Sequence, residues 1–95
     1  MSTDKDYKNF ILDQLNLLEN ITCRHMMGEY LLYHRGKIFG GIYDNRLLVK
    51  RTDEGKKLNL QEEIPYSGAK PMYFVENIDD KEYLKTVVET VYNSL

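Results

Sequence analysis

Cys23 and His25 are the two side chains whose types and spacing come closest to a chemical site. They lie two positions apart, so on a β-strand they would point to the same face. A thiol beside an imidazole could seed a metal site or form a nucleophilic pair. A zinc site needs about four ligands, and His34 is the one other soft donor in the sequence, with no CxxC, HxxxH or HExxH motif. We therefore expect no metal, no cofactor and no catalytic residue, and interpret the pair as a buried thiol beside a polar edge histidine. An enzyme using Cys23 and His25 remains an alternative, which alkylation of Cys23 would test.

Other reactive groups have structural interpretations. The carboxylates are scattered singly on expected helices, and Asp79-Asp80 is typical of a helix start. No nucleotide-binding glycine motif and no GxSxG is present. Gly40-Gly41 falls inside an expected strand, where glycine marks a bulge or a close backbone contact. Met26-Met27 could form an adaptable binding surface, but we expect core packing.

Length and composition favour one ordinary globular domain over residues 1–95. The chain is 42% hydrophobic and 29% charged, which suits a folded domain rather than a disordered one. No apolar run approaches the roughly 20 residues of a membrane span, and the first ten residues are too polar for a signal peptide. Cys23 is the single cysteine and cannot form an internal disulfide. We expect a cytoplasmic protein that does not contact membranes.

The charges are distributed unevenly along the chain. Residues 24–57 carry eight Lys/Arg against four Asp/Glu, although the whole chain has a net charge of −2. A basic middle could attract an acidic partner or a phosphate backbone. The favoured interpretation is that acidic helices complement a basic sheet within one molecule, because a pI near 5.6 is not typical of nucleic-acid binding.

Hydrophobic periodicity predicts a helix followed by a meander of strands. Thr3 and Asp6 fit a capping box, and apolar residues then recur at spacings of three and four until Asn20. The period next changes to two, over expected strands at 21–27, 29–34, 37–43 and 46–51. Asp44-Asn45 predicts a two-residue hairpin turn of type I′. Loops this short require antiparallel neighbours.

The last forty residues predict a second helical segment, a fifth strand and a closing helix. Thr52 can cap a short helix over 52–60, which Gly55 weakens. A loop at 65–71 precedes a strand at 72–76, and Asp79 with Glu82 opens a strongly amphipathic helix. The order is α-β-β-β-β-α-β-α. We expect an α+β two-layer sandwich: an antiparallel sheet of about five strands with helices on one face.

Three strands are apolar on both faces, at 30–33, 47–49 and 72–75. A sheet with one solvated face should alternate apolar and polar residues. We therefore expect a partner to cover the second face. A homodimer through the sheet is the simplest solution, and a different protein would serve equally well.

Short segments spread along the chain resemble the TfoX N-terminal domain family. The first three segments contribute Arg24, Met26, Gly28, then Tyr33, Gly36, Lys37, Phe39, then Asp44, Leu47, Lys50. The fourth contributes Tyr66, Gly68, Ala69, Lys70, Pro71 and Met72. The resemblance covers about residues 8 to 95, with Met27, Glu29 and Arg35 as departures. It implies the α+β architecture derived above. It also implies kinship with two-domain regulators that promote competence genes together with a cyclic-AMP receptor protein, and we expect this chain to lack their helical second domain.

Two functions are consistent with these observations. The first is a non-enzymatic regulatory module that binds a protein through the apolar second face and a basic rim. We define the basic rim as Arg35, Lys37, Arg46, Lys50 and Arg51. The second is direct nucleic-acid binding by this rim, with Tyr33, Tyr43 or Tyr73 as stacking faces. A steep loss of affinity with salt would distinguish the second from the first.

Overall fold

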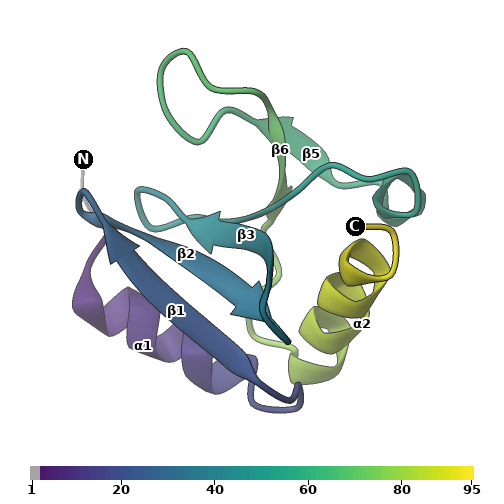
Figure 1. Cartoon of the computed structure of the whole chain (residues 1–95), viewed down its shortest axis with the longest axis horizontal. Coiled ribbons are helices and arrows are strands. Elements are labelled where there is room, and N and C mark those ends of the chain that lie inside the picture. Colours follow the sequence, from purple (N-terminus) through teal and green to yellow (C-terminus); the bar gives the residue numbers. More distant parts are fainter. Residues whose placement is uncertain (1–2) are drawn as a thin grey trace.

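The computed structural model describes residues 3–95, so the first two residues of the expected domain 1–95 lie outside the described part. These residues hold two α-helices, one 3-10 helix and six strands (Figure 1). In chain order they are α1 (Lys5–Gln14), β1 (Ile21–Met26), β2 (Glu29–His34), β3 (Lys37–Ile42), β4 (Leu47–Val49), η1 (Gly55–Leu58), β5 (Gln61–Glu63), β6 (Met72–Val75) and α2 (Lys81–Tyr92). None of these helices is long and apolar enough to cross a membrane.

The strands form one antiparallel sheet in the order β1-β2-β3-β4-β6-β5. The expected meander of the first four strands is confirmed. Its last turn is also confirmed, because Asp44 and Asn45 have φ of 52° and 56°, and Tyr43 and Arg46 exchange two backbone hydrogen bonds. Positive φ at both central residues is the requirement of a type I′ hairpin.

Gly40 and Gly41 lie where two strands approach closely, as expected for glycines inside a strand. A Cβ on Gly40 would lie 2.2 Å from the carbonyl oxygen of Leu48, and one on Gly41 would lie 2.6 Å from that of Tyr30. Beside them, the register of β2 and β3 shifts at Leu32/Tyr33, which is a β-bulge. A side chain at either glycine would force these strands apart.

The predicted helix over 52–60 is wrong in type and length. Thr52 does cap this segment, since its Oγ1 accepts a hydrogen bond from the Gly55 N–H at 3.0 Å. The helix is a 3-10 turn over Gly55–Leu58 and ends where Asn59 takes a left-handed conformation, with φ of 55°. The chain then forms β5, a strand that the polar residues Gln-Glu-Glu did not indicate. The sheet described here therefore has six strands rather than about five.

The ends of both helices differ from the sequence interpretation. α1 ends at Gln14 rather than Asn20, and tight turns continue the chain as far as β1. The Thr3/Asp6 capping box is wrong: the Thr3 hydroxyl donates instead to Glu29 Oε1 at 2.7 Å. α2 is capped by Asp80 rather than Asp79, because the Tyr83 N–H donates to Asp80 Oδ1 at 3.1 Å.

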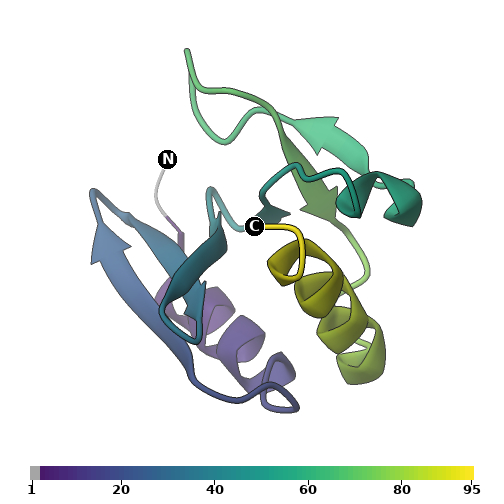
Figure 2. The ribbon, with the colours of Figure 1, turned by 45° about the vertical axis from the view of Figure 1, so that its right-hand side comes forward.

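Both helices cover the same face of the sheet, as expected, and lie on its lower right side in Figure 2. Strand residues that alternate on this face join helix residues in one buried cluster. From the strands it contains Leu32, Phe39, Ile42, Leu47, Val49, Tyr73 and Val75, and from the helical side Ile11, Leu15, Leu84, Val87, Val88 and Val91. We call the opposite face, which the helices leave free, the second face.

Candidate functional site

The second face carries an apolar pocket of about 380 Å³ at the tip of the β1–β2 hairpin. We call it the methionine pocket; it is lined by Met26, Met27, Glu29, Leu31, Tyr43 and Tyr66. Met27 is 95% exposed and Met26 48% exposed. The expected core packing of this pair is therefore wrong. Met26 points to the second face of the edge strand β1, and Met27 is in the following turn with φ of 54°.

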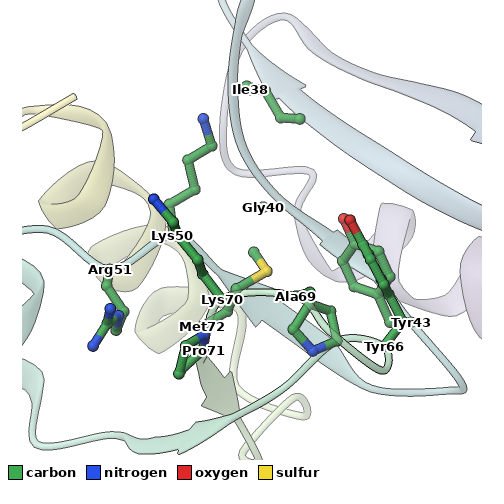
Figure 3. A pocket seen from close by; sticks show the side chains of 11 residues that line it. Ile38, Gly40, Tyr43, Lys50, Arg51, Tyr66, Ala69, Lys70, Pro71 and Met72 are labelled. Carbon is green, nitrogen blue, oxygen red and sulfur yellow. The ribbon is translucent and has the colours of Figure 1, made fainter.

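A second pocket of about 450 Å³ adjoins the first. We call it the lysine pocket, because Lys50, Arg51 and Lys70 line it and none of its lining residues is acidic. In Figure 3, Tyr43 and Tyr66 stand on one side of this pocket, with Lys50 and Lys70 on the other. The pocket thus combines aromatic and cationic walls.

Tyr43 and Tyr66 belong to both pockets and join them into one groove. Their ring centroids lie 6.1 Å apart at an interplanar angle of 49°. Tyr66 is 62% exposed, whereas Tyr43 is buried and its ring lies against Gly41. Burial raises the pKa of the Tyr43 hydroxyl, and the neighbouring Tyr66 and Glu29 raise it further. The Tyr43 hydroxyl at the centre of the groove is therefore held in its uncharged form.

Arg46 holds the loop that carries Tyr66. Its Nη1 donates to Glu63 Oε1 at 2.6 Å, and its Nη2 donates to the carbonyl oxygens of Ile64 and Pro65 at 3.3 and 3.2 Å. Its Nε donates to the carbonyl oxygen of Tyr43 at 3.2 Å. Arg46 therefore clamps the 64–71 loop, which projects at the top of Figure 1, onto the β3–β4 hairpin.

The remaining residues of the basic rim do not form one surface. Arg35 Nη2 lies 3.6 Å from Glu19 Oε2, and Arg51 Nη1 lies 3.4 Å from Glu62 Oε1. The Lys37 ammonium lies 5.4 Å from the ring centroid of Tyr92, which belongs to α2. Lys50 follows β4, whereas Arg46 precedes it, so the strand separates them. Only Lys50 and Arg51 of the rim line the lysine pocket.

The stacking faces proposed for nucleic-acid binding are mostly closed. Tyr73 is 5% and Tyr43 8% exposed, while Tyr33 is partly buried on the second face. The exposed aromatic residue of the groove is Tyr66, which the sequence interpretation assigned only to a loop. The sequence interpretation likewise places Lys70 in that loop and outside the basic rim. The family-like segment 66–72 was the one sequence signal that could have pointed to both.

The other family-like residues lie in hairpin turns, on the second face, in the core and at the lysine pocket. Gly28 and Gly36 occupy hairpin turns with φ of 83° and 82°. Arg24 and Tyr33 face the second face, by their register with Leu31 and Thr22, and Phe39 is fully buried in the core. Lys50 and segment 66–72, which lie far apart in the chain, meet at the lysine pocket.

Cys23 and His25 lie on one face of β1, as predicted, and this is the face that the helices cover. Burial raises the pKa of the Cys23 thiol, and Lys8 lowers it by less, so the fold does not activate a thiolate here. His34 pairs with Ile21, at the end of β1 away from His25, and its Nδ1–H donates to the Glu19 carbonyl oxygen at 2.7 Å. Within residues 3–95, no group of three or more His, Cys, Asp or Glu side chains could hold a metal ion.

Comparison with known proteins identifies relatives over most of the chain. The family model described as TfoX N-terminal domain matches residues 13–93. A curated relative from Spirochaeta aurantia, an uncharacterized 12.7 kDa protein in the trpE 5' region, is 38% identical over 80 residues. The aligned region covers 82% of this chain and 70% of that protein.

Proposed function

Because this chain belongs to the TfoX N-terminal domain family, whose domain is non-catalytic, we propose that it is a regulatory module that binds a protein partner through its second face. The partner would belong to the control of gene expression, the role of the family's two-domain regulators. A cytoplasmic site of action is part of the proposal, since a single free thiol suits a reducing compartment.

The exposed methionine pocket is the observation that carries this proposal. Its apolar side chains cluster on the sheet face that no helix covers, and Met27 and Tyr66 extend furthest into solvent. Clustered apolar surface on a small domain is typical of a binding site. Methionine side chains suit such a site, because their flexible thioethers adapt to the shape of a partner.

Direct nucleic-acid binding has weaker support. Arg35, Arg46 and Arg51 each have a carboxylate within 4 Å, which reduces the charge they can offer to phosphates. Glu29 lines the methionine pocket, and Asp44 lies with it in a neighbouring pocket, so an extended polyanion that followed the groove would meet negative charge there. The chain as a whole has a net charge of −2.

The proposal is tested by affinity capture from native lysate with three forms of the tagged protein. Met27→Glu places a charge in the methionine pocket at a side chain that makes little contact with the fold, whereas Asn9→Glu adds the same charge on exposed α1. We expect the wild type and Asn9→Glu to retain the same proteins after nuclease treatment, and Met27→Glu to lose them. Equal capture by Met27→Glu, or loss of all binding with nuclease, would contradict the proposal.

A further inference from the structure

Lys50 and Lys70 are two of the eight Lys and Arg side chains within residues 3–95 that have no carboxylate within 4.0 Å, and they share one pocket. Within residues 3–95, the cations with a carboxylate within 4.0 Å are Arg35, Arg46, Arg51, Lys57 and Lys81. Lys50 and Lys70 have no such partner. Both lysines line the same pocket, together with Arg51, and no acidic side chain lines it with them. This pocket is therefore a local excess of positive charge on an acidic protein.

The opposite end of the groove has the reverse character. Met26, Met27 and Leu31 make the methionine pocket apolar. The one carboxylate that lines it, Glu29, already accepts hydrogen bonds from groups of this chain. Glu29 accepts hydrogen bonds from the Thr3 hydroxyl at 2.7 Å and from the Asp44 N–H at 3.1 Å. A ligand that reaches both ends must therefore present apolar surface at one end and negative charge at the other.

We propose that the groove binds a short segment of a partner protein in which a large apolar side chain lies next to two or more carboxylates. The apolar side chain fills the methionine pocket, the backbone passes Tyr43 and Tyr66, and the carboxylates pair with Lys50 and Lys70. This rests on the proposed function and specifies the chemistry of the partner.

Charge complementarity favours such a segment over nucleic acid. A pocket with two unpaired lysines matches two or three carboxylates, whereas a nucleic-acid strand would continue its negative charge along the groove to Glu29. Tyr66, at the point where the pockets meet, offers an exposed phenol ring that packs against a peptide backbone and excludes water around the ion pairs, while the buried Tyr43 lies beside it.

The experiment uses a phage-displayed library of random peptides as the probe, selected against the full chain. Wild type should enrich peptides with a large apolar residue beside Asp or Glu, and the double variant Lys50→Glu/Lys70→Glu should enrich Lys or Arg in their place. The tightest wild-type peptide, labelled with fluorescein, should bind the double variant and Met27→Glu each about tenfold more weakly. Its affinity should also fall as salt rises. If the melting curve of Lys50→Glu/Lys70→Glu shows that this variant is misfolded, Lys50→Gln/Lys70→Gln is used in its place.

The outcomes separate this proposal from the proposed function. Peptides that lose affinity for Met27→Glu but not for the lysine variant would overturn the charge pairing and leave the function standing. Peptides that bind Met27→Glu and the lysine variant as tightly as the wild type would overturn both proposals. Sedimentation of the free protein as a dimer that excludes the peptide, or displacement of the peptide by an oligonucleotide, would also overturn the inference, since the groove would then bind a second copy or a nucleic acid.

Discussion

Arg46→Ala tests whether this arginine is a structural clamp or a contact for a partner. The substitution removes an ion pair at 2.6 Å in which the arginine and Glu63 side chains are only 25% and 27% exposed. It also removes donors to three backbone carbonyls that lie in two separate chain segments. Because a hydrogen bond to a charged group contributes roughly 1.5–3 kcal/mol and the freed carbonyls can regain water, we expect a loss of about 2 kcal/mol in the free energy of unfolding.

For a domain of this size, that loss corresponds to a fall of about 10 °C in Tm. Urea unfolding followed by circular dichroism measures the free energy, and a thermal scan gives Tm. Arg51→Ala is the matched control, since Arg51 makes a single contact of 3.4 Å to Glu62 with 44% of its side chain exposed. Exposed ion pairs of this kind contribute roughly 0–1 kcal/mol, so the control should melt almost like the wild type.

A double-mutant cycle with Glu63→Gln completes the test. If the two side chains stabilise each other, the loss in Arg46→Ala/Glu63→Gln is smaller than the sum of the single losses. Unchanged stability of Arg46→Ala would refute the clamp. If partner binding were lost without any change in stability, Arg46 would be a direct contact, as its place in the predicted basic rim implied.

Three further predictions concern the fold. Gly36→Val should lower stability by about 1–2 kcal/mol, because Gly36 has φ of 82° and a side chain there meets strain but no neighbour; Gly36→Asn should lose less, and equal melting of Gly36→Val and wild type would contradict the turn. Val88→Asp should abolish the folded, soluble protein, since Val88 is fully buried in the core, whereas Val88→Ala should fold with a lower Tm; a folded Val88→Asp protein would place this helix face elsewhere. Burial raises the folded-state pKa of Cys23 and Tyr43 above their ordinary values of 9.0 and 10.0. The contribution of these two groups to the free energy of unfolding is therefore complete below those values and is lost as the pH rises through their raised folded-state pKa values. Urea unfolding should show a stability that falls in alkali, and the fall should be shallower in Tyr43→Phe.

Local signals predicted the part of the fold that depends on few neighbours. Asp44-Asn45 and the glycines at 28 and 36 indicated three hairpin turns, and short turns between apolar runs require an antiparallel meander. The apolar stripe of α2 identified the helix face that packs on the sheet. These features follow from the conformational preferences of adjacent residues.

The errors occur where distant residues decide the structure. β5 consists of Gln61–Glu63, which has little intrinsic preference for a strand, and it forms by pairing with β6 across the 64–71 loop. Methionine is a residue type that usually lies in the core, but the hairpin between β1 and β2 exposes both Met26 and Met27 to solvent. The spacing of apolar residues in the sequence could predict neither the pairing of β5 with β6 nor the exposure of the two methionines.

The candidate site differs in its residues from the surface that the sequence predicts. The sequence predicts an apolar second face from strand residues at 30–33, 47–49 and 72–75, but of these only Leu31 lines the methionine pocket, and Leu48 is fully buried. The basic rim was assembled from charges close in sequence, whereas Arg46 has its partners 17 to 19 residues away and turns inward to them. Lys70 and Tyr66 join the groove because Arg46 holds the 64–71 loop beside the β3–β4 hairpin.

The central claim, that the second face binds a protein partner, is tested most directly by NMR with the captured partner. Unlabelled partner is titrated into the ¹⁵N-labelled full chain, and shifts of backbone amide signals are followed. We predict that the largest shifts come from Met27, Leu31, Tyr66 and Lys50, which line the groove. Shifts concentrated on the outer surfaces of α1 and α2, with the groove signals unchanged, would contradict the account.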